Sequence, residues 1–197
     1  MRTILRTLLI CLLAPAAAGL AQDRPPTTPA APVAPAAPSK DPLTGFNKTL
    51  YQGLKPILIR SAEKMPEENY SFKPAESVRS FGQILGHVAD SQYLFCSRVL
   101  GEKRPEIKVE ETKTSKADLI AALKEAFAYC DKAYSNMTDA SGAETIKFMG
   151  RDTPKLGALT TNSVHTVEHY GNLITYLRMK NIVPPSSDPE FSPTGKK

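Results

Sequence analysis

Four long stretches of the sequence repeat apolar residues at the spacing of an α-helix, with proline or glycine between one stretch and the next. We expect helices at residues 43–64, 80–100, 115–137 and 155–180. Proline inside a helix removes a hydrogen bond and clashes with the preceding turn, so these breaks end each helix. Apolar residues every three or four positions form a stripe on one helix face. In the second stretch the stripe consists of Phe81, Ile84, Leu85, Val88, Phe95 and Val99.

Four amphipathic helices without a convincing sheet indicate an all-α domain, a four-helix bundle with long connections. The connection of about thirteen residues between the second and third helices can span roughly 40 Å, whereas a 20-residue helix is roughly 30 Å long. These two helices can therefore run parallel instead of forming a tight antiparallel hairpin. We also expect Pro56 to kink or interrupt the first helix, and a short strand at residues 145–149 is an alternative to coil there.

Two cysteines occupy matching positions in the second and third expected helices. Cys96 lies 16 residues after Ser80, and Cys130 lies 15 residues after Ser115. In a parallel pair of helices the two side chains are level, whereas an antiparallel hairpin separates their Cα atoms well beyond the roughly 7 Å that a disulfide allows. We therefore predict a Cys96–Cys130 disulfide, with two buried thiols as the alternative.

The first 21 residues have the pattern of a secretory signal peptide. Arg2 and Arg6 precede an apolar run at residues 8–13, and the sequence Ala-Gly-Leu-Ala at positions 18–21 resembles a small-residue cleavage site. The apolar run is too short to span a membrane. We therefore expect an exported chain, periplasmic or secreted, from which residues 1–21 are removed, with an uncleaved anchor as the alternative.

The remaining chain divides into a linker, one domain and a tail. Residues 22–42 contain seven of the seventeen prolines and are expected to form an extended, semi-rigid linker. The bundle is expected at residues 43–183, and residues 184–197 are expected to form a disordered tail. No later segment reads as membrane-spanning, so we expect no integral membrane segment after removal of the signal peptide.

The charge balance does not favour nucleic acid as a partner. Loss of the signal peptide removes two arginines and no acidic residue, which lowers the formal net charge from +5 to +3. No basic run with interleaved aromatic residues is present. We therefore expect a small-molecule substrate or ligand and no nucleic acid.

The sequence contains three histidines, and two of them lie one helical turn apart. His165 and His169 are spaced i,i+4, which places both rings on one helix face. His87 shares a face with apolar residues of the second helix and is expected to point at least partly inward. If the helices bring it opposite the pair, the three neutral imidazoles can bind one divalent metal and leave a coordination position open. The alternatives are a chance pair and a histidine satisfied within the core.

Polar residues near the pair are candidates for further roles. Asn162 and Asn172 share its helix face and can orient the ligands, or they can hydrogen-bond to a neighbouring helix. Glu168 completes the order H-x-x-E-H of inverted zinc peptidases, where the glutamate activates water. Such peptidases need a third, acidic ligand far downstream, and only 28 residues follow the second histidine of the pair. We therefore do not expect a peptidase of this kind, but Glu168 and Asp90 are candidate catalytic bases. The alternative is that these side chains face solvent or a neighbouring helix and have no catalytic role.

Four stretches carry a resemblance to a known family. They are residues 65–74 (MPEENYSFKP), 81–90 (FGQILGHVAD), 168–178 (EHYGNLITYLR) and 184–187 (PPSS). With one histidine on the second helix and an H-x3-H pair on the fourth, the chain resembles the DinB superfamily, a group of DinB/YfiT-like metal-binding bundles. The resemblance extends from about Pro42 to Pro185.

The resemblance implies a fold, a ligand set and a class of activity. It implies an up-down-down-up bundle in which His87, His165 and His169 bind a divalent metal, most often zinc or nickel. Some members of the family transfer or isomerise substrates with a low-molecular-weight thiol, and many form dimers. The chain is therefore expected to be a metal-dependent hydrolase or thiol-dependent transferase, or a non-catalytic exported protein that binds metal or a small ligand. Export away from the cytosolic thiol pool weighs against thiol transfer.

Overall fold

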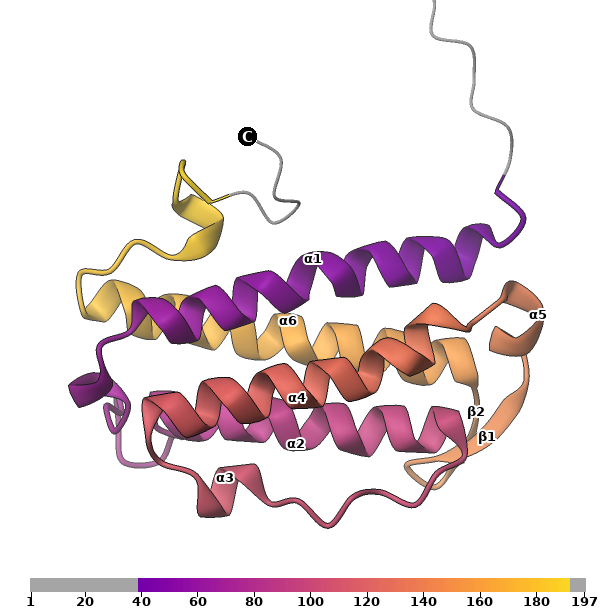
Figure 1. Ribbon diagram of the computed structural model, residues 1–197, viewed down its shortest axis with the longest axis horizontal. Coiled ribbons are helices and arrows are strands. Elements are labelled where there is room, and N and C mark those ends of the chain that lie inside the picture. The colour runs from indigo at the N-terminus through magenta and orange to yellow at the C-terminus, as the bar shows by residue number, and fades with distance from the viewer. Residues whose placement is uncertain (1–38, 192–197) are drawn as a thin grey trace, which may run out of the picture. The chain divides into compact units, whose positions relative to one another are not determined.

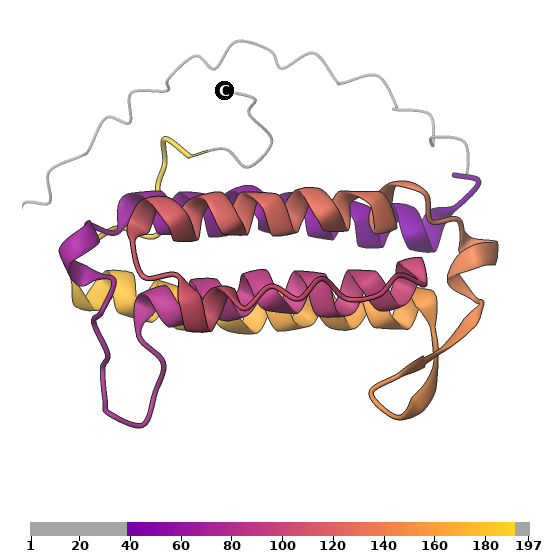
Figure 2. The ribbon, with the colours of Figure 1, turned by 60° about the horizontal axis from the view of Figure 1, so that its bottom comes forward.

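The computed structural model describes residues 39–191, so the predicted signal peptide, nearly all of the linker and the last residues of the tail lie outside the described part. Four long helices dominate the described residues: α1 (Pro42–Lys64), α2 (Phe81–Leu100), α4 (Lys116–Ser135) and α6 (Lys155–Met179). They form two layers, α1 beside α4 and α2 beside α6 (Figure 2). The protein is mostly helical, as predicted.

Short elements fill the connections between the long helices. The described residues include two short α-helices, α3 (Val109–Thr112) and α5 (Asp139–Gly142), and two 3₁₀ turns, η1 (Glu67–Asn69) and η2 (Pro185–Ser187). The connection after α2 returns along the bundle to α3, so that α4 runs beside α2 in the same direction (Figure 1). No helix among the described residues is long and apolar enough to cross a membrane.

Side-chain caps explain where the two helices of this pair begin. The Ser80 hydroxyl accepts a hydrogen bond from the Gln83 N–H (3.2 Å), and the Gln83 side chain accepts one from the Ser80 N–H (2.8 Å). This is the predicted capping box, which satisfies two N–H groups at the helix start. Gly101 ends α2 at φ 71°, a conformation that glycine adopts without strain. The Ser115 hydroxyl caps α4 by accepting a hydrogen bond from the Asp118 N–H, without the reciprocal bond of a capping box.

Three predicted details differ from the structure. Helix α1 is a single helix that contains Pro56, so the proline does not interrupt it, whereas a kink at this position stays a prediction. Helix α4 ends at Ser135, two residues before the predicted end. The absence of a sheet was also wrong, whereas the alternative of a short strand at residues 145–149 is confirmed. Strand β1 (Thr145–Phe148) pairs antiparallel with β2 (Arg151–Pro154) through a turn at Met149 and Gly150, which have φ values of 49° and 78°.

The disulfide predicted from the matching cysteine positions is present. Cys96 on α2 and Cys130 on α4 are bonded, with their Cα atoms 5.3 Å apart, and both side chains are fully buried. The bond joins two helices from different layers in the middle of the apolar core. Helix α2 is therefore held to α4 on one side while its other side packs against α6.

Candidate metal centre

The three histidines meet where α2 packs against α6. The Nε2 atom of His165 lies 3.1 Å from Nε2 of His87 and 3.1 Å from Nε2 of His169. Three ring nitrogens, one from each histidine, all lie within 4.8 Å of one another. The expectation that His87 points at the helical pair is therefore confirmed.

This arrangement fits the requirements of a divalent metal. Metal–nitrogen bonds of about 2.0–2.1 Å at tetrahedral angles place neighbouring ligand nitrogens about 3.4 Å apart, close to the two Nε2 separations observed. Burial, with the neighbouring His87 imidazole, holds the pKa of His165 below its ordinary value. Burial, with the two other imidazoles, lowers the pKa of His169 to about 4. Both rings are thus neutral near pH 7, the form that binds metal.

Glu110 is a site residue that the sequence did not single out. Its Oε2 lies 3.0 Å from Nδ1 of His87. A carboxylate there accepts the Nδ1 proton, so that the Nε2 lone pair of His87 is free to face the other two histidines. The other oxygen of Glu110 accepts a hydrogen bond from Nε of Arg79 at 2.7 Å. Arg79, Glu110 and His87 therefore form a continuous polar chain that ends at the cluster.

Two residues on α2 place Glu110 beside His87. The Asp90 carboxylate accepts hydrogen bonds from the backbone N–H groups of Val109 (2.8 Å) and Glu110 (3.0 Å), which holds the start of α3 against α2. Gly86 allows the close approach, because a Cβ atom there would lie 2.6 Å from the Cα of Glu110. The observed contacts of Asp90 are thus with the α3 backbone, and its role as a base stays a prediction.

The other polar candidates lie in different surroundings. The Asn172 Nδ2 atom is 3.4 Å from Nδ1 of His169, so this asparagine lies behind a histidine as predicted. Asn162 instead donates to Gln92 (2.9 Å) and Tyr134 (3.2 Å) in the core, which is the helix-to-helix alternative. Glu168 is exposed on α6 next to His169. Its role as a base also stays a prediction.

An apolar wall closes the side of the cluster toward the hairpin. The ring of Phe95 lies 5.5 Å from that of His165 and 5.4 Å from that of Phe148 on β1. The Nδ1 atom of His165 is buried and has no hydrogen-bond partner among the described residues. Packing thus orients His165, whereas polar contacts orient His87 and His169.

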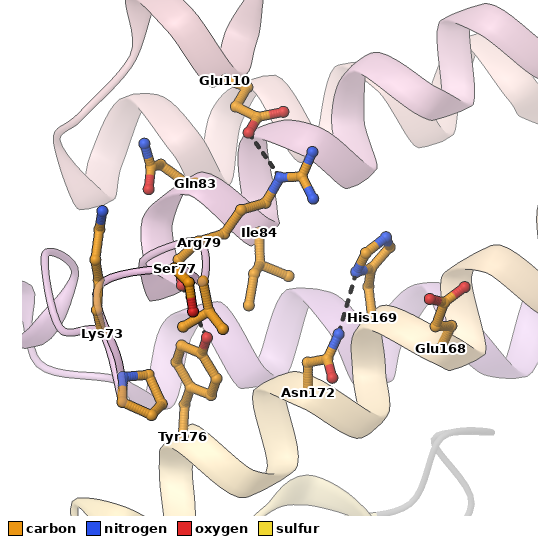
Figure 3. A pocket seen from close by; sticks show the side chains of 12 residues that line it. Lys73, Ser77, Arg79, Gln83, Ile84, Glu110, Glu168, His169, Asn172 and Tyr176 are labelled. Carbon is orange, nitrogen blue, oxygen red and sulfur yellow. Dashed lines mark hydrogen bonds and ion pairs between the residues drawn. The ribbon is translucent and has the colours of Figure 1, made fainter.

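A cleft of about 690 Å³ opens beside His169 (Figure 3). Its walls come from α6, from the start of α2, from α3 and from the segment that precedes α2. His169 is the member of the cluster that lines it. The polar side chains in the wall are those of Lys73, Ser77, Arg79, Gln83, Glu110, Glu168, Asn172 and Tyr176.

Fold and cluster together define a helical protein with three convergent histidines between two helices, beside a cleft of small-molecule size. The family model of the DinB superfamily matches residues 57–173. The chain belongs to the DinB superfamily.

Individual relatives agree with this assignment. The uncharacterized protein YjoA of Bacillus subtilis is 31% identical over 120 residues, which cover 59% of this chain and 77% of YjoA. The crystal structure of a DinB-like protein from Bacillus cereus superposes with a TM-score of 0.60 at 19% identity, over 67% of this chain and 89% of that one. The crystal structure of Bacillus subtilis YjoA gives 0.57 at 22% identity, over 69% and 92%. Because the two structures are only 19% and 22% identical to this chain, the likeness shows a shared fold and nothing further.

Proposed function

We propose that the protein binds one divalent metal ion, zinc or nickel, through Nε2 of His87, His165 and His169. The convergence of the three Nε2 atoms carries the proposal. The lowered pKa values of His165 and His169 support it, because a proton does not compete for these nitrogens near neutral pH. Glu110 supports it as well, since a carboxylate behind a histidine fixes the tautomer that binds metal.

We infer that the site acts on a small molecule held in the cleft beside His169. A divalent metal lowers the pKa of water or of a thiol, which supplies a nucleophile near neutral pH for hydrolysis or for thiol-dependent transfer. Glu168 lies at the cleft and is our candidate for the base. A non-catalytic metal- or ligand-binding protein is the second candidate. Two observations favour it: Asp90 is engaged by backbone N–H groups, and Glu168 is exposed.

We also infer the order of the four long helices, the export of the chain and a homodimer. An up-down-down-up order of the four long helices is supported by the parallel course of α2 and α4 and by the long return between them (Figure 1). Export by the signal peptide at residues 1–21 is supported by its sequence pattern, and the Cys96–Cys130 disulfide suits an oxidising compartment. A homodimer remains a proposal that size measurements in solution would test.

Metal analysis tests the proposed site. We expect wild-type protein, purified without added metal, to contain close to one zinc or nickel ion per chain, and His169→Ala to lose it. Thr161→Ala, an exposed change on the same helix, should keep full occupancy. Full occupancy in His169→Ala would refute the site. Metal-dependent turnover of esters or of a thiol-dependent transfer would favour the enzyme over the binding protein.

A further inference from the structure

The cleft beside His169 carries two positive side chains with unused hydrogen-bonding capacity. We propose that it binds a small organic molecule through a carboxylate held by Arg79, so that the rest of the molecule extends toward the three histidines. This inference rests on the proposed function for its reactive end. The part assigned to Arg79 depends only on the cleft.

Arg79 is held in place at both ends. Its backbone carbonyl accepts a hydrogen bond from the Tyr176 hydroxyl at 2.8 Å, which ties it to α6. Its Nε donates to Glu110 at 2.7 Å. Neither terminal guanidinium nitrogen has an acceptor within residues 39–191. Figure 3 shows these two nitrogens beyond the ion pair, on the side of the cleft where His169 lies.

Such an arginine is suited to a carboxylate. A guanidinium presents parallel N–H groups that match the two oxygens of a carboxylate. Because Glu110 already restrains the side chain, binding costs less conformational entropy than it would for a free surface arginine. The Arg79 side chain is 44% exposed, so its free edge is accessible from solvent.

The charges around the cleft favour an anion over a neutral ligand. Both oxygens of Glu110 are engaged, one by Arg79 and one by His87. A divalent ion at the three histidines would add positive charge beside the cleft, where Glu110 and Glu168 are the acidic side chains of the wall. Lys73 lines the cleft, apart from His169 (Figure 3), and forms no ion pair within the described residues.

The same features favour a carboxylate over a phosphate. Only one restrained arginine edge is available, whereas a phosphate dianion presents three oxygens to be satisfied. The acidic side chain of Glu168 also lines the cleft and disfavours a second negative charge on the same group. The ligand class is therefore a small carboxylic acid whose second functional group reaches the histidines.

Two probes separate the arginine from the metal. Succinate has a carboxylate at each end, and succinamate replaces one of them with a neutral amide, so both can reach a metal but only succinate offers Arg79 a second carboxylate. In titration calorimetry of the metal-loaded protein, we expect succinate to bind about tenfold more tightly, the value of one charge-assisted contact. Arg79→Gln should remove this difference.

Arg60→Gln is the matched control, because Arg60 is an arginine of similar exposure (48%) whose nearest ion-pair partner is Glu63 on the same helix. It should keep the tenfold preference for succinate. A preference that survives Arg79→Gln in protein with full metal occupancy, or equal binding of both probes to wild type, would overturn the carboxylate proposal. Tighter binding of inorganic phosphate than of succinate would overturn the ligand class.

The test also distinguishes this proposal from the proposed function. Metal content is measured for every variant before titration. If wild-type protein takes up no metal, the proposed function fails, and the titrations are made on the metal-free protein. Succinate binding that Arg79→Gln weakens would then still support the cleft assignment, and absence of succinate binding would overturn it.

Discussion

Replacement of Glu110 by glutamine tests how the polar chain behind His87 contributes to the metal site. The glutamine side chain keeps nearly the same shape, and its carbonyl oxygen can still accept the Nδ1 proton of His87. What is lost is the negative charge 3.0 Å from that nitrogen. The perturbation is therefore electrostatic and leaves the cleft volume almost unchanged.

The size of the effect follows from the contact. A hydrogen bond to an ionised group contributes about 1.5–3 kcal/mol, and a neutral one about 0.5–1.5 kcal/mol. The side chains of His87 and Glu110 are 24% and 26% exposed, so solvent screens the interaction only partly. A loss of about 1–1.4 kcal/mol corresponds to a five- to tenfold weaker metal affinity, at or just below the smallest effects that changes behind metal-binding histidines cause.

The assay is a competition between the protein and a chromophoric chelator, with zinc or nickel as the metal. Glu111→Gln provides the matched control: Glu111 is the next residue of α3, its side chain is 66% exposed and it pairs with Lys108 at the surface. We expect wild-type affinity for Glu111→Gln and the five- to tenfold loss for Glu110→Gln. Equal affinities for both variants would refute the assignment of Glu110.

Three other predictions concern packing, the disulfide and pH. Gly86→Ala should displace α3, because the new Cβ would lie 2.6 Å from the Cα of Glu110. We expect a loss of about 1–3 kcal/mol of unfolding free energy and a weaker metal affinity. Chemical denaturation measures the first and chelator competition the second. Reduction of Cys96–Cys130 should raise the intact mass by two hydrogens and cost about 3–4 kcal/mol of unfolding free energy for a separation of 34 residues. In the metal-free protein, the pKa of His169 is about 4 against an ordinary 6.5, so the unfolded chain takes up the proton first. Its unfolding free energy should therefore fall as the pH drops through this interval, and His169→Ala should reduce the slope of urea-unfolding free energy against pH.

Periodicity and spacing predicted the features that depend on regular helices. The level positions of Cys96 and Cys130 led to the disulfide. Helical spacing placed His165 and His169 on one face and turned His87 partly inward, and the resemblance to the DinB superfamily implied that the three histidines meet, as they do. The helical spacing itself is present in the order of apolar residues.

The features that were missed depend on contacts between segments that carry no periodic signal. Glu110 lies in the connection between the second and third expected helices, and its half-buried position beside His87 depends on a four-residue helix held by Asp90. The sequence nevertheless contained a signal for this contact. Gly86 and Asp90, the two residues that bring Glu110 close to α2, lie one residue before and three residues after His87. Strand β2 was missed since residues 151–154 do not alternate apolar and polar side chains.

The covalent link between α2 and α4 has a consequence for the way the site handles its ion. His87 lies nine residues before Cys96 on α2, so about 13 Å of this helix separates the histidine from the disulfide. The disulfide anchors α2 to α4 whether or not an ion is present. Small zinc domains, in contrast, unfold when the metal is removed. If the proposed metal binds, we therefore expect the three histidines to keep their arrangement without it, so that removal or exchange of the metal does not require the chain to refold.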